Sequence, residues 1–447
     1  MISRKFSLPA IFVAGALALS GCAAPADPAS TETSDSGTTV TMRVWDETVA
    51  EAYETSFEAF TEKNPNITVD VNVVPWAEYW KKLRTDVAGS SADDLFWVNN
   101  AYFAPYADSG NLVDVTDLLG ADVQKDWEPS VVSQYTREDQ LWGVPQFYDA
   151  GIAVYYNKAI LDEVGVDPAA LAELSWVPGG GEGDSYLPMA KKLTRDANGV
   201  AGDAEGFDGA NLARYGTNLS YDVQGVLLPF IGSNGGTFQD GEEFSFAGEK
   251  SAQAVEYIVK AVNEAHVAPS AADTNLTDDF NRDAFIQGNM AMFQSGLYNL
   301  KNVADGADFE WGVAPIPAGP EGRVAVTNGI AVAGNAHSTK KDAVKKVLQW
   351  LGSAEGNAPL GAGGSAVPAV VEAQSAYFDF WKKEGVDVQP FFDVISETKP
   401  LPALTGSNYS AGYAAFNPIL QEVFKGSVPV GEGLKRAQDA GNVAIRK

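Results

Sequence analysis

The stretch TVTMRVWDETVAEAYETSFEAFTEKNPNITVDVNVVP, residues 39–75, carries two hydrophobic periods in succession. Residues 39–46 and 66–75 alternate apolar and polar side chains, which is the pattern of a strand. Between them, apolar residues recur at helical spacing, at Val49, Tyr53, Phe57 and Phe60. Asn64-Pro65 ends this helical pattern, because proline cannot continue a helix. The order strand, helix, strand predicts two parallel strands joined by a covering helix.

Strands and helices continue to alternate along the chain. A second helix is expected over residues 76–89, and a third strand over 93–100. Two strand-like pieces flank Tyr148-Asp149, and a helix follows from Lys158. Later segments are predicted to be helical at 187–193, 221–231, 250–265, 278–287, 339–352, 369–383, 410–425 and 430–444, and strand-like at 309–316 and 323–333. This order predicts an α/β fold with mostly parallel sheet, and a chain of 447 residues favours two domains.

The N-terminal segment has the composition of an export signal. Arg4 and Lys5 precede an apolar run over residues 6–19. This run is shorter than the roughly 20 apolar residues of a membrane span, so a cleaved signal peptide fits better. Cys22, the only cysteine, ends it, and residues 23–38 are small and polar. Such a composition predicts a flexible tether.

The composition disfavours several classes of function. The formal net charge is −28, and an acidic surface repels the phosphates of nucleic acids. A single cysteine permits neither an intrachain disulfide nor a zinc site of the cysteine type. Only two histidines occur, His266 and His337, and they lie far apart in sequence. The usual nucleophilic and metal-hydrolase residues are therefore nearly absent, and no catalytic residue is predicted.

Five stretches, taken in order, carry a resemblance to a known family. They are LSGC (19–22), DLFWVNNAYFAPYADSGNLVDVTDLL (94–119), WGVPQFYDAGIAVYYNKAIL (142–161), FIQGNMAMFQSGLYNL (285–300), and WGVAPIPAGPEGR (311–323) followed by TNGIAVAGNAHSTKKDAVKKVLQWL (327–351). Their order and spacing resemble the extracellular solute-binding proteins of ABC importers, specifically the large sugar-binding type related to maltose-binding protein (family 1). LSGC looks like a bacterial lipobox, in which the cysteine becomes lipidated.

The resemblance implies a two-lobed, type II periplasmic-binding-protein-like fold. Each lobe would be a sheet covered by helices, and hinge crossings would join the lobes. The implied segments are a signal peptide over 1–21, a lipidated Cys22 and tether over 22–38, an N-terminal lobe over 39–149 plus 315–353, and a C-terminal lobe over 152–312 plus 366–447.

The resemblance also implies a function without catalysis. The chain would be a substrate-binding lipoprotein that captures a neutral sugar in an interlobe cleft. The aromatic richness of the chain, at 11 %, favours an oligosaccharide over a monosaccharide. Hinge closure would then deliver the sugar to the permease subunits of the transporter. The expected location is the outer face of the cytoplasmic membrane, with acyl chains on Cys22 as the anchor. A monomer is expected, without cofactor and without nucleic acid.

Sugar binding calls for aromatic rings over the C–H faces and for carboxylates and amides at the hydroxyls. Open α/β sheets bind ligands beyond the carboxyl ends of their strands. The candidates of this kind at strand ends and at the first crossing are Trp45, Asp46, Glu47, Trp76, Asn99, Asn100, Tyr102, Tyr148 and Asp149. Each also has a structural alternative: the tryptophans can pack the sheet, Asp46 and Asn100 can cap helices, and Asp149 can sit in a hinge turn.

Later in the chain, the candidates are Asn234, Tyr298, Asn328, Tyr409 and Tyr413, with the GGS stretch at 363–365 as a weaker one. By resemblance, Tyr298 stands where the family has a stacking aromatic residue. Turn chemistry alone also explains Asn234. None of the candidates is Lys or Arg, which an anionic ligand would normally demand.

The segment DANGVAGDAEGFD (196–208) gathers oxygen-bearing side chains at Asp196, Asn198, Asp203, Glu205 and Asp208. Such a density of oxygen ligands makes Ca²⁺ a weak candidate cofactor. The spacing is not that of an EF-hand, and a solvated loop is the better explanation of the segment.

Two other functions remain open from the residues alone. A secreted glycoside hydrolase would bind sugar with the same side chains, but it needs a pair of carboxylates across one bond. An adhesive surface lipoprotein would need no hinge closure. No stretch resembles a hydrolase motif.

Overall fold

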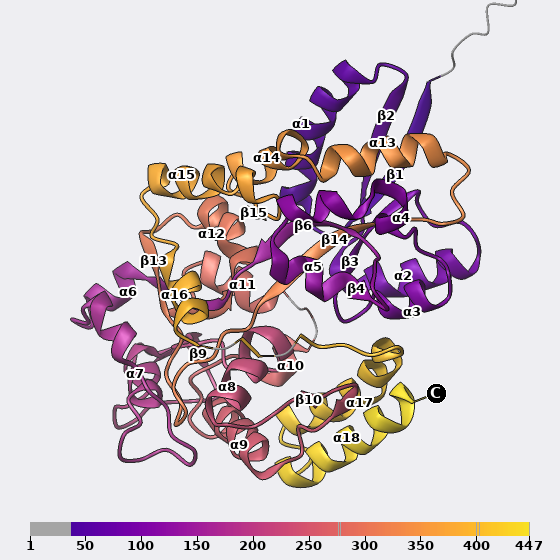
Figure 1. Cartoon of the computed structure of the whole chain (residues 1–447). Coiled ribbons are helices and arrows are strands. Elements are labelled where there is room, and N and C mark those ends of the chain that lie inside the picture. Colours follow the sequence, from indigo (N-terminus) through magenta and orange to yellow (C-terminus); the bar gives the residue numbers. More distant parts are fainter. Residues whose placement is uncertain (1–36, 276, 278, 399, 402, 447) are drawn as a thin grey trace, which may run out of the picture. The chain divides into compact units, whose positions relative to one another are not determined.

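A six-stranded sheet holds the N-terminal strands, in the spatial order β15-β6-β14-β3-β1-β2. Its strands are β1 Thr38–Val44, β2 Ile67–Val73, β3 Leu95–Asn99, β6 Val144–Asp149, β14 Asn328–Gly334 and β15 Val367–Pro368. β1 runs parallel to β2 and β3, as the opening stretch predicts. β14 lies between β3 and β6 and runs antiparallel to both, so that residues far apart in the sequence share one sheet (Figure 1).

A three-stranded sheet follows the first crossing, in the order β12-β7-β13. Its strands are β7 Ile152–Asn157, β12 Met292–Gly296 and β13 Trp311–Pro315, and both neighbours run antiparallel to β7. The prediction of mostly parallel sheet is therefore wrong. Parallel neighbours arise when successive strands are joined through a helix that covers the sheet. Here the chain passes from β6 directly into the second sheet, and it comes back to the first sheet only at β14 and β15, after long intervening segments.

The computed structural model describes residues 37–447 except 276, 278, 399, 402 and 447. Residues 37–447 form one compact unit. The predicted signal peptide, Cys22 and all of the predicted tether except residues 37 and 38 lie outside the described residues. The chain enters β1 at Thr38, the last residue of that predicted tether. The predicted lobe boundaries stay a prediction.

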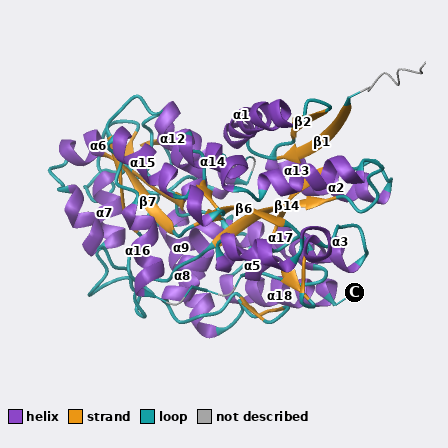
Figure 2. Cartoon of the chain, turned by 45° about the horizontal axis from the view of Figure 1, so that its top comes forward, coloured by secondary structure: helices purple, strands orange, loops and turns teal. Residues whose placement is uncertain are grey.

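Helices flank both sheets (Figure 2). They are α1 Glu47–Lys63, α2 Trp76–Ala88, α3 Ala104–Asp108, α4 Val115–Leu119, α5 Pro129–Tyr135, α6 Lys158–Glu163, α7 Tyr186–Leu193, α8 Leu228–Ser233, α9 Glu249–Asn263, α10 Ala271–Thr274, α11 Phe280–Ile286, α12 Leu300–Gly306, α13 Lys341–Leu351, α14 Ala354–Ala362, α15 Ser375–Glu384, α16 Gln389–Glu397, α17 Tyr409–Phe424 and α18 Val430–Ile445. The longer ones agree with the helical segments predicted from the sequence. Several others, among them α5, α12, α14 and α16, lie outside the predicted helical segments.

Short elements complete the chain. The two-residue and three-residue strands are β4 Thr136–Arg137, β5 Gln140–Leu141, β8 Arg195–Asp196, β9 Leu212–Arg214, β10 Gln239–Asp240 and β11 Glu243–Phe244. The 3₁₀ turns are η1 Ala121–Asp126, η2 Pro168–Glu173, η4 Leu297–Asn299 and η5 Val371–Ala373, and η3 Val223–Leu227 is a π-helix.

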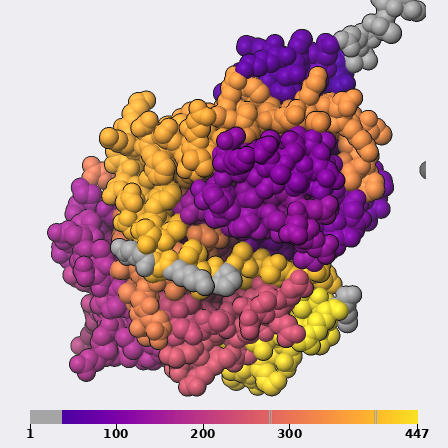
Figure 3. Space-filling model, viewed as in Figure 1, coloured from indigo at the N-terminus to yellow at the C-terminus, as the bar shows by residue number. Residues whose placement is uncertain are grey.

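The cap and the apolar stripe of α1 explain why it forms where it does. Asp46 is the N-cap and accepts the Val49 backbone N–H at 3.0 Å. The predicted stripe is buried, and Tyr53 at its centre accepts the Trp97 indole N–H at 3.1 Å. Further along the chain, α14 packs against α1, so residues beyond 350 lie against the N-terminal helix (Figure 3).

The crossing from β6 to β7 is two residues long and tightly packed. Gly151 has a φ of +46°, a backbone conformation that favours glycine. A Cβ at this position would also overlap the Phe391 carbonyl oxygen of α16. The two sheets are therefore joined by a link that tolerates little change.

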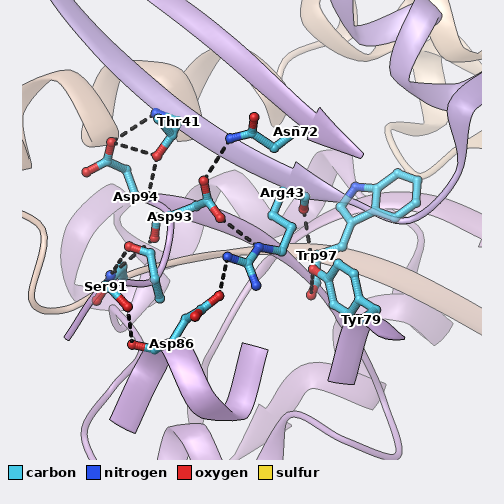
Figure 4. Close-up of polar contacts among 11 residues, drawn as sticks. Thr41, Arg43, Asn72, Tyr79, Asp86, Ser91, Asp93, Asp94 and Trp97 are labelled. Atoms are coloured by element: carbon cyan, nitrogen blue, oxygen red, sulfur yellow. Dashed lines mark hydrogen bonds and ion pairs between the residues drawn. The ribbon is translucent and has the colours of Figure 1, made fainter. Parts of the chain in front are cut away.

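A buried ion network ties β1 to α2 and to the start of β3 (Figure 4). Arg43 is 7 % exposed, and its guanidinium donates to Asp86 and to Asp93, each at 2.6 Å. Asp93 also accepts the Asn72 side-chain amide of β2 at 2.9 Å. Tyr79 of α2 donates its hydroxyl to the Trp97 carbonyl at 2.8 Å. These contacts hold α2, and with it Trp76 and Trp80, against the sheet.

Arg43→Met should destabilise the protein by about 3–5 kcal/mol, because it leaves the carboxylates of Asp86 and Asp93 without their cation in a mostly buried place. Urea denaturation measures this change. The matched control is Arg436→Met, whose ion pair with Glu432 is exposed at 3.6 Å and should change stability by less than about 0.5 kcal/mol. Equal effects of the two substitutions would contradict the role given to the network.

Candidate functional site

One edge of the six-stranded sheet collects most of the predicted binding residues. β1 and β3 are parallel, and β14 is antiparallel to β3 and β6. The carboxyl ends of β1, β3 and β6 and the start of β14 therefore lie at the same edge. Asn99 ends β3, Asp149 ends β6 and is paired with Asn328 of β14, and Trp45 follows β1. The structure thus brings together residues from four separate stretches of sequence.

Trp45 is the centre of an aromatic group at this edge. Its ring centroid lies 5.2 Å from that of Trp76 and 5.7 Å from that of Trp80, both on the first turns of α2. Trp97 and Tyr79 pack against it from the core side, at 4.6 and 5.0 Å. Trp45 and Trp80 are half-buried, whereas Trp76 is 38 % exposed. Trp76 thus offers an accessible ring surface, held by its neighbours in a fixed orientation.

Tyr102 extends the aromatic group toward the second sheet. Its ring stacks on Trp80 with a centroid distance of 4.2 Å and an interplanar angle of 12°. Tyr409 of α17 meets Tyr102 edge to face at 5.3 Å, and Tyr413 lies 6.3 Å from Tyr409. Tyr409 belongs to the apolar core that also includes β7 and β12 residues. The contact therefore joins elements of the two sheets.

The two asparagines after β3 already have hydrogen bonds. Asn99 accepts the Ala101 backbone N–H at 3.0 Å, so it shapes its own turn. Asn100 donates its side-chain amide to the Leu404 carbonyl at 3.2 Å, in the segment before α17. Both are largely buried. Asn100 thus makes a second link between the two sheets in addition to the Tyr102–Tyr409 contact.

Asp149, Tyr148 and Asn328 form the polar part of the edge. Asp149 is 8 % exposed, and burial raises the pKa of its carboxyl to about 8. Burial, Glu128 and Asp149 raise the pKa of Tyr148 to about 12. Asn328 donates to the Gln224 side-chain oxygen at 3.4 Å, and its own side-chain oxygen is buried without a partner among the described residues. These are groups able to hydrogen-bond a ligand.

Asp46 and Glu47 lie at the start of α1, facing α11 and α12. Burial raises the pKa of Asp46, whereas the Val49 and Thr48 backbone N–H groups and the charge of Arg282 lower it, with burial the largest effect. Glu47 is exposed. The next residue, Thr48, donates its hydroxyl to Asn302 of α12 at 3.2 Å. The capping alternative for Asp46 is confirmed; a ligand contact stays a prediction.

Tyr298 lies in η4, two residues after the end of β12, with its ring against Gly296. A Cβ at residue 296 would overlap the Tyr298 ring, so the glycine is needed for this arrangement. The residue is 37 % exposed, yet burial of its hydroxyl raises its pKa, and the charges of Asp222 and Asp149 raise it further. Tyr298 is therefore close to the polar part of the edge.

The π-helix η3 brings a polar segment to the same region. Pro229 lacks an N–H group, so the Gly225 carbonyl, four residues earlier, cannot accept the usual α-helical hydrogen bond. It accepts the Gln294 side-chain amide of β12 at 2.7 Å. Asp222 caps the element by accepting the Gln224 and Gly225 backbone N–H groups at 3.0 and 2.8 Å. The Gln224 side chain is then available to Asn328. π-Helical turns are frequent at functional sites.

Asn234 is not brought together with the other candidates. It ends α8 and is fully buried. Its amide donates to the Lys250 carbonyl of α9 at 2.7 Å. Its observed contacts therefore hold α8 against α9.

The GGS stretch at 363–365 follows α14, where Ser365 Oγ lies 3.5 Å from the Thr48 carbonyl.

The carboxylates of the 196–208 loop hydrogen-bond the loop itself. Asp196 accepts the backbone N–H groups of Asn198, Val200 and Asp208 at 2.8–3.0 Å, and the Asp208 interaction contributes most to the lowering of its pKa. Asp208 accepts from Ala210 and Asn211, and Asp203 is exposed. Within the described part of the chain, no three His, Cys, Asp or Glu side chains are grouped as a metal site. The calcium site stays a prediction.

Sequence reasoning missed several residues of this region. Trp80 stands one helical turn after Trp76, so their spacing alone could have placed both on one face of α2. Asp222 and Gln224 come from the start of a segment predicted only as helical, and no local signal indicates that the Gln224 side chain reaches Asn328 of β14. Arg282 is also close to Asp46, a proximity that only the fold creates.

The two sheets, the two-residue crossing between them and the residues gathered at the strand ends define a class of protein. The fold is the two-lobed, type II fold of periplasmic binding proteins. Residues 45–358 match the family described as bacterial extracellular solute-binding protein, and the chain belongs to that family.

Known proteins similar to this chain agree with that assignment. A crystal structure of UspC from Mycobacterium tuberculosis is 48 % identical, with a TM-score of 0.70, covering 91 % of this chain and 100 % of that one. An ABC substrate-binding protein of Listeria monocytogenes in complex with cycloalternan has a TM-score of 0.77 at 21 % identity, covering 92 % and 99 %. An uncharacterized ABC transporter extracellular-binding protein of Pyrococcus horikoshii is 24 % identical, covering 94 % and 93 %.

Among the described residues, no helix combines the length and the apolar character that a membrane crossing requires.

Asp149→Asn should remove a pH dependence of stability. The folded carboxyl has a pKa of about 8, whereas an unfolded aspartate has one of about 3.9. Between these values the unfolded chain has released a proton that the folded chain keeps, so wild-type stability falls as pH rises from about 4 to about 8. Asn cannot ionise, so at pH 8 the variant should be more stable by roughly 2 kcal/mol or more, and at pH 4 nearly equal.

Thermal unfolding of both proteins in matched buffers from pH 4 to pH 8 measures this. Asp203→Asn, a change of the same kind at an exposed loop carboxylate, serves as the control and should follow wild type. Parallel stability curves for Asp149→Asn and wild type would show that the carboxyl ionises freely.

Proposed function

We propose that this chain is the sugar-binding lipoprotein of an ABC importer. It captures a neutral oligosaccharide between its lobes and delivers it to the permease by hinge closure. The ligand rings would stack on Trp76 and Tyr298, and Asp149, Tyr148 and Asn328 would hydrogen-bond its hydroxyls. The protein performs no chemistry on the sugar.

The observation that carries the proposal is the combination of rings and neutral polar groups at one sheet edge. Trp76 and Tyr298 expose 38 % and 37 % of their surface while aromatic or glycine neighbours fix their orientation. The buried carboxyl of Asp149 has a pKa of about 8, so near neutral pH it both donates and accepts hydrogen bonds. No Lys or Arg is among the candidate residues, which disfavours an anionic ligand.

Similar proteins support two parts of this proposal, the sugar ligand and the ABC transporter. The Listeria protein is described in complex with cycloalternan and as an ABC substrate-binding protein. The Pyrococcus relative is named as an ABC transporter binding protein. A receptor of this kind typically binds near micromolar, which corresponds to about −8 kcal/mol. Two stacked rings and several hydrogen bonds to neutral groups are sufficient for that affinity after ordering costs.

A ligand screen tests the proposal directly. The mature protein is heated with glucose, mannose and their α-1,4- and β-1,4-linked oligomers. A ligand that binds only the folded state raises its stability by RT ln(1 + [L]/Kd), so at about 100 Kd the gain is about 2.7 kcal/mol. At least one oligomer should raise the midpoint and be recovered unchanged. No shift with any member would argue against a sugar receptor, and steady release of shorter sugars would indicate a glycoside hydrolase instead.

Trp76→Ala should weaken binding of a sugar found in that screen about 30-fold, a loss of about 2 kcal/mol, because the exposed ring surface is no longer available to be covered. Isothermal titration calorimetry measures it. The control is Phe378→Ala on α15, since Phe378 is 37 % exposed and its ring packs against Tyr377 and Phe392. Its Kd should stay within about twofold of wild type, and an unchanged Kd for Trp76→Ala would remove this ring from the site.

The anchor is a separate part of the proposal, and it rests on LSGC at residues 19–22. Mass spectrometry of the protein purified from bacterial membranes should find Cys22 as an acylated N-terminus. Cys22→Ser should move the protein from the membrane fraction to the soluble fraction. An unmodified Cys22 in membrane-derived protein would contradict the anchor and leave the binding function intact.

A further inference from the structure

The guanidinium group of Arg137 bridges elements that belong to different apolar cores. Arg137 lies in β4, between Tyr135 and Leu141, which are part of the core around the six-stranded sheet. On that side, its Nε and Nη2 groups donate to the two carboxylate oxygens of Asp108, at 2.6 and 2.9 Å. On the other side, Nη2 also donates to Ser407 Oγ at 2.9 Å.

An acidic hairpin completes the surroundings of this guanidinium. Glu242, in the turn between β10 and β11, has a carboxylate oxygen 3.8 Å from Nη1. Phe244 of β11 and Tyr409, the first residue of α17, belong to the core that also contains β7 and β12 residues. The bidentate pair with Asp108 fixes the plane of the guanidinium, so its remaining N–H groups are held toward Ser407 and Glu242.

The hairpin that carries Arg137 has an unusual backbone conformation. β4 and β5 are joined by Glu138 and Asp139, whose φ angles are +54° and +61°. A two-residue hairpin turn with both residues in the left-handed region usually carries Asn-Gly, and a glutamate there is uncommon. The Trp142 indole N–H donates to the Arg137 carbonyl at 3.2 Å and fixes the hairpin. Backbone strain of this kind persists only where the surroundings hold it, and it is frequent in ligand clamps and switch regions.

We name residues 403–408, directly before α17, the strap. Gln239 of β10 makes two hydrogen bonds to the Thr405 backbone, at 2.6 and 2.9 Å, and so fixes the strap to its own side. From the six-stranded sheet, the Asn100 side-chain amide donates to the Leu404 carbonyl at 3.2 Å. The guanidinium of β4 contacts the strap three residues later. Two polar side chains of one side therefore bind a segment that is fixed to the other side.

These contacts lie away from the crossing that joins the two sheets. The crossing follows β6, which ends at Asp149, whereas Asn100 follows β3, and β14 lies between these two strands. Neighbouring strands are about 4.8 Å apart, so the contact between Asn100 and the strap is roughly 10 Å from the crossing along the sheet edge. Rotation about the crossing would separate Arg137 and Asn100 from the strap, because both contacts lie at a distance from the hinge.

We infer that Arg137 and the strap form a latch that holds the two lobes closed in the absence of sugar. This inference rests on the proposed function, since it takes hinge closure from it. The Ser407 hydrogen bond and the Glu242 ion pair stabilise the closed conformation. Opening breaks both, whereas the Asp108 pair lies on one side and keeps the guanidinium oriented for the next closure. The latch shifts the equilibrium toward the closed protein and slows the release of a bound sugar.

Arg137→Gln tests the latch without any sugar. Small-angle X-ray scattering at low salt gives the radius of gyration of the ligand-free protein. The variant should have a larger radius than wild type, because a two-lobed protein is more extended when its lobes part. Ser407→Ala removes one hydroxyl and should change the radius in the same direction by a smaller amount. If Arg137→Gln does not fold, Ser407→Ala decides the question.

The release rate of a bound sugar is a second measurement. For a sugar found in the ligand screen, stopped-flow dissociation from Arg137→Gln should be about 5-fold faster than from wild type, because a charge-assisted hydrogen bond across the two sides is lost. Should no sugar bind, the proposed function is refuted, whereas the latch is still decided by the radius of the ligand-free protein.

The matched control is Arg446→Gln. Arg446 pairs with Glu243, the neighbour of Glu242 on the same hairpin, but this ion pair is exposed and joins α18 to β11 within one side. It should leave the radius and the release rate as in wild type. The inference is overturned if Arg137→Gln and Ser407→Ala both keep the wild-type radius, or if Arg446→Gln increases the radius equally.

Discussion

The insertion of β14 between β3 and β6 is the constraint on which the rest of the structure depends. Because β14 is antiparallel to both neighbours, its first residue lies at the edge where β3 and β6 end. Asn328 is thereby placed beside Asp149, although the two residues are 179 positions apart in the numbering. The strand is fully buried along its length, so a shift in its register would expose apolar side chains and displace the polar edge together. The same insertion leaves Asp149 directly before the two-residue crossing to the second sheet.

The hydrogen bonding of buried polar groups differs between two parts of the molecule, the surroundings of Arg43 and the edge of the sheet that carries the candidate site. Around Arg43, the guanidinium donates to two carboxylates, and one of these also accepts a side-chain amide; the Nη1 group of Arg43 is buried without a partner among the described residues, and the network holds α2 in place. At the sheet edge, the Asn328 side-chain oxygen and the Trp80 indole N–H are each buried without a partner among the described residues. Such groups are unfavourable in the free protein and favourable once a polar ligand arrives. The first arrangement stabilises the scaffold, and the second makes it ready to bind.

Individual strands and helices could be predicted from the sequence, because hydrophobic periodicity and helix capping depend only on residues that are close together in the chain. The opening stretch predicts β1, α1 and β2 almost to the residue. Capping of α1 was the structural alternative considered for Asp46, and Asp46 is the N-cap of that helix. The prediction of mostly parallel sheet fails because strand direction depends on long returns. β14 and β15 come back after residue 300 to a sheet begun near residue 40. No periodicity in their own residues indicates a neighbour so distant in the chain.

The sequence by itself determined which residue types were available at the strand ends: indoles, phenols, amides and carboxylates, with no cation among the candidates. It also determined the family, since the order of motifs spans most of the chain. Only the tertiary structure decided which of these residues meet. It set Asn234 against α9, buried Asp149, and brought Tyr221 to α17. The physical reason is that burial, unpaired hydrogen-bonding groups and shifted pKa values arise from contacts between distant segments, and these contacts exist only after the chain has folded.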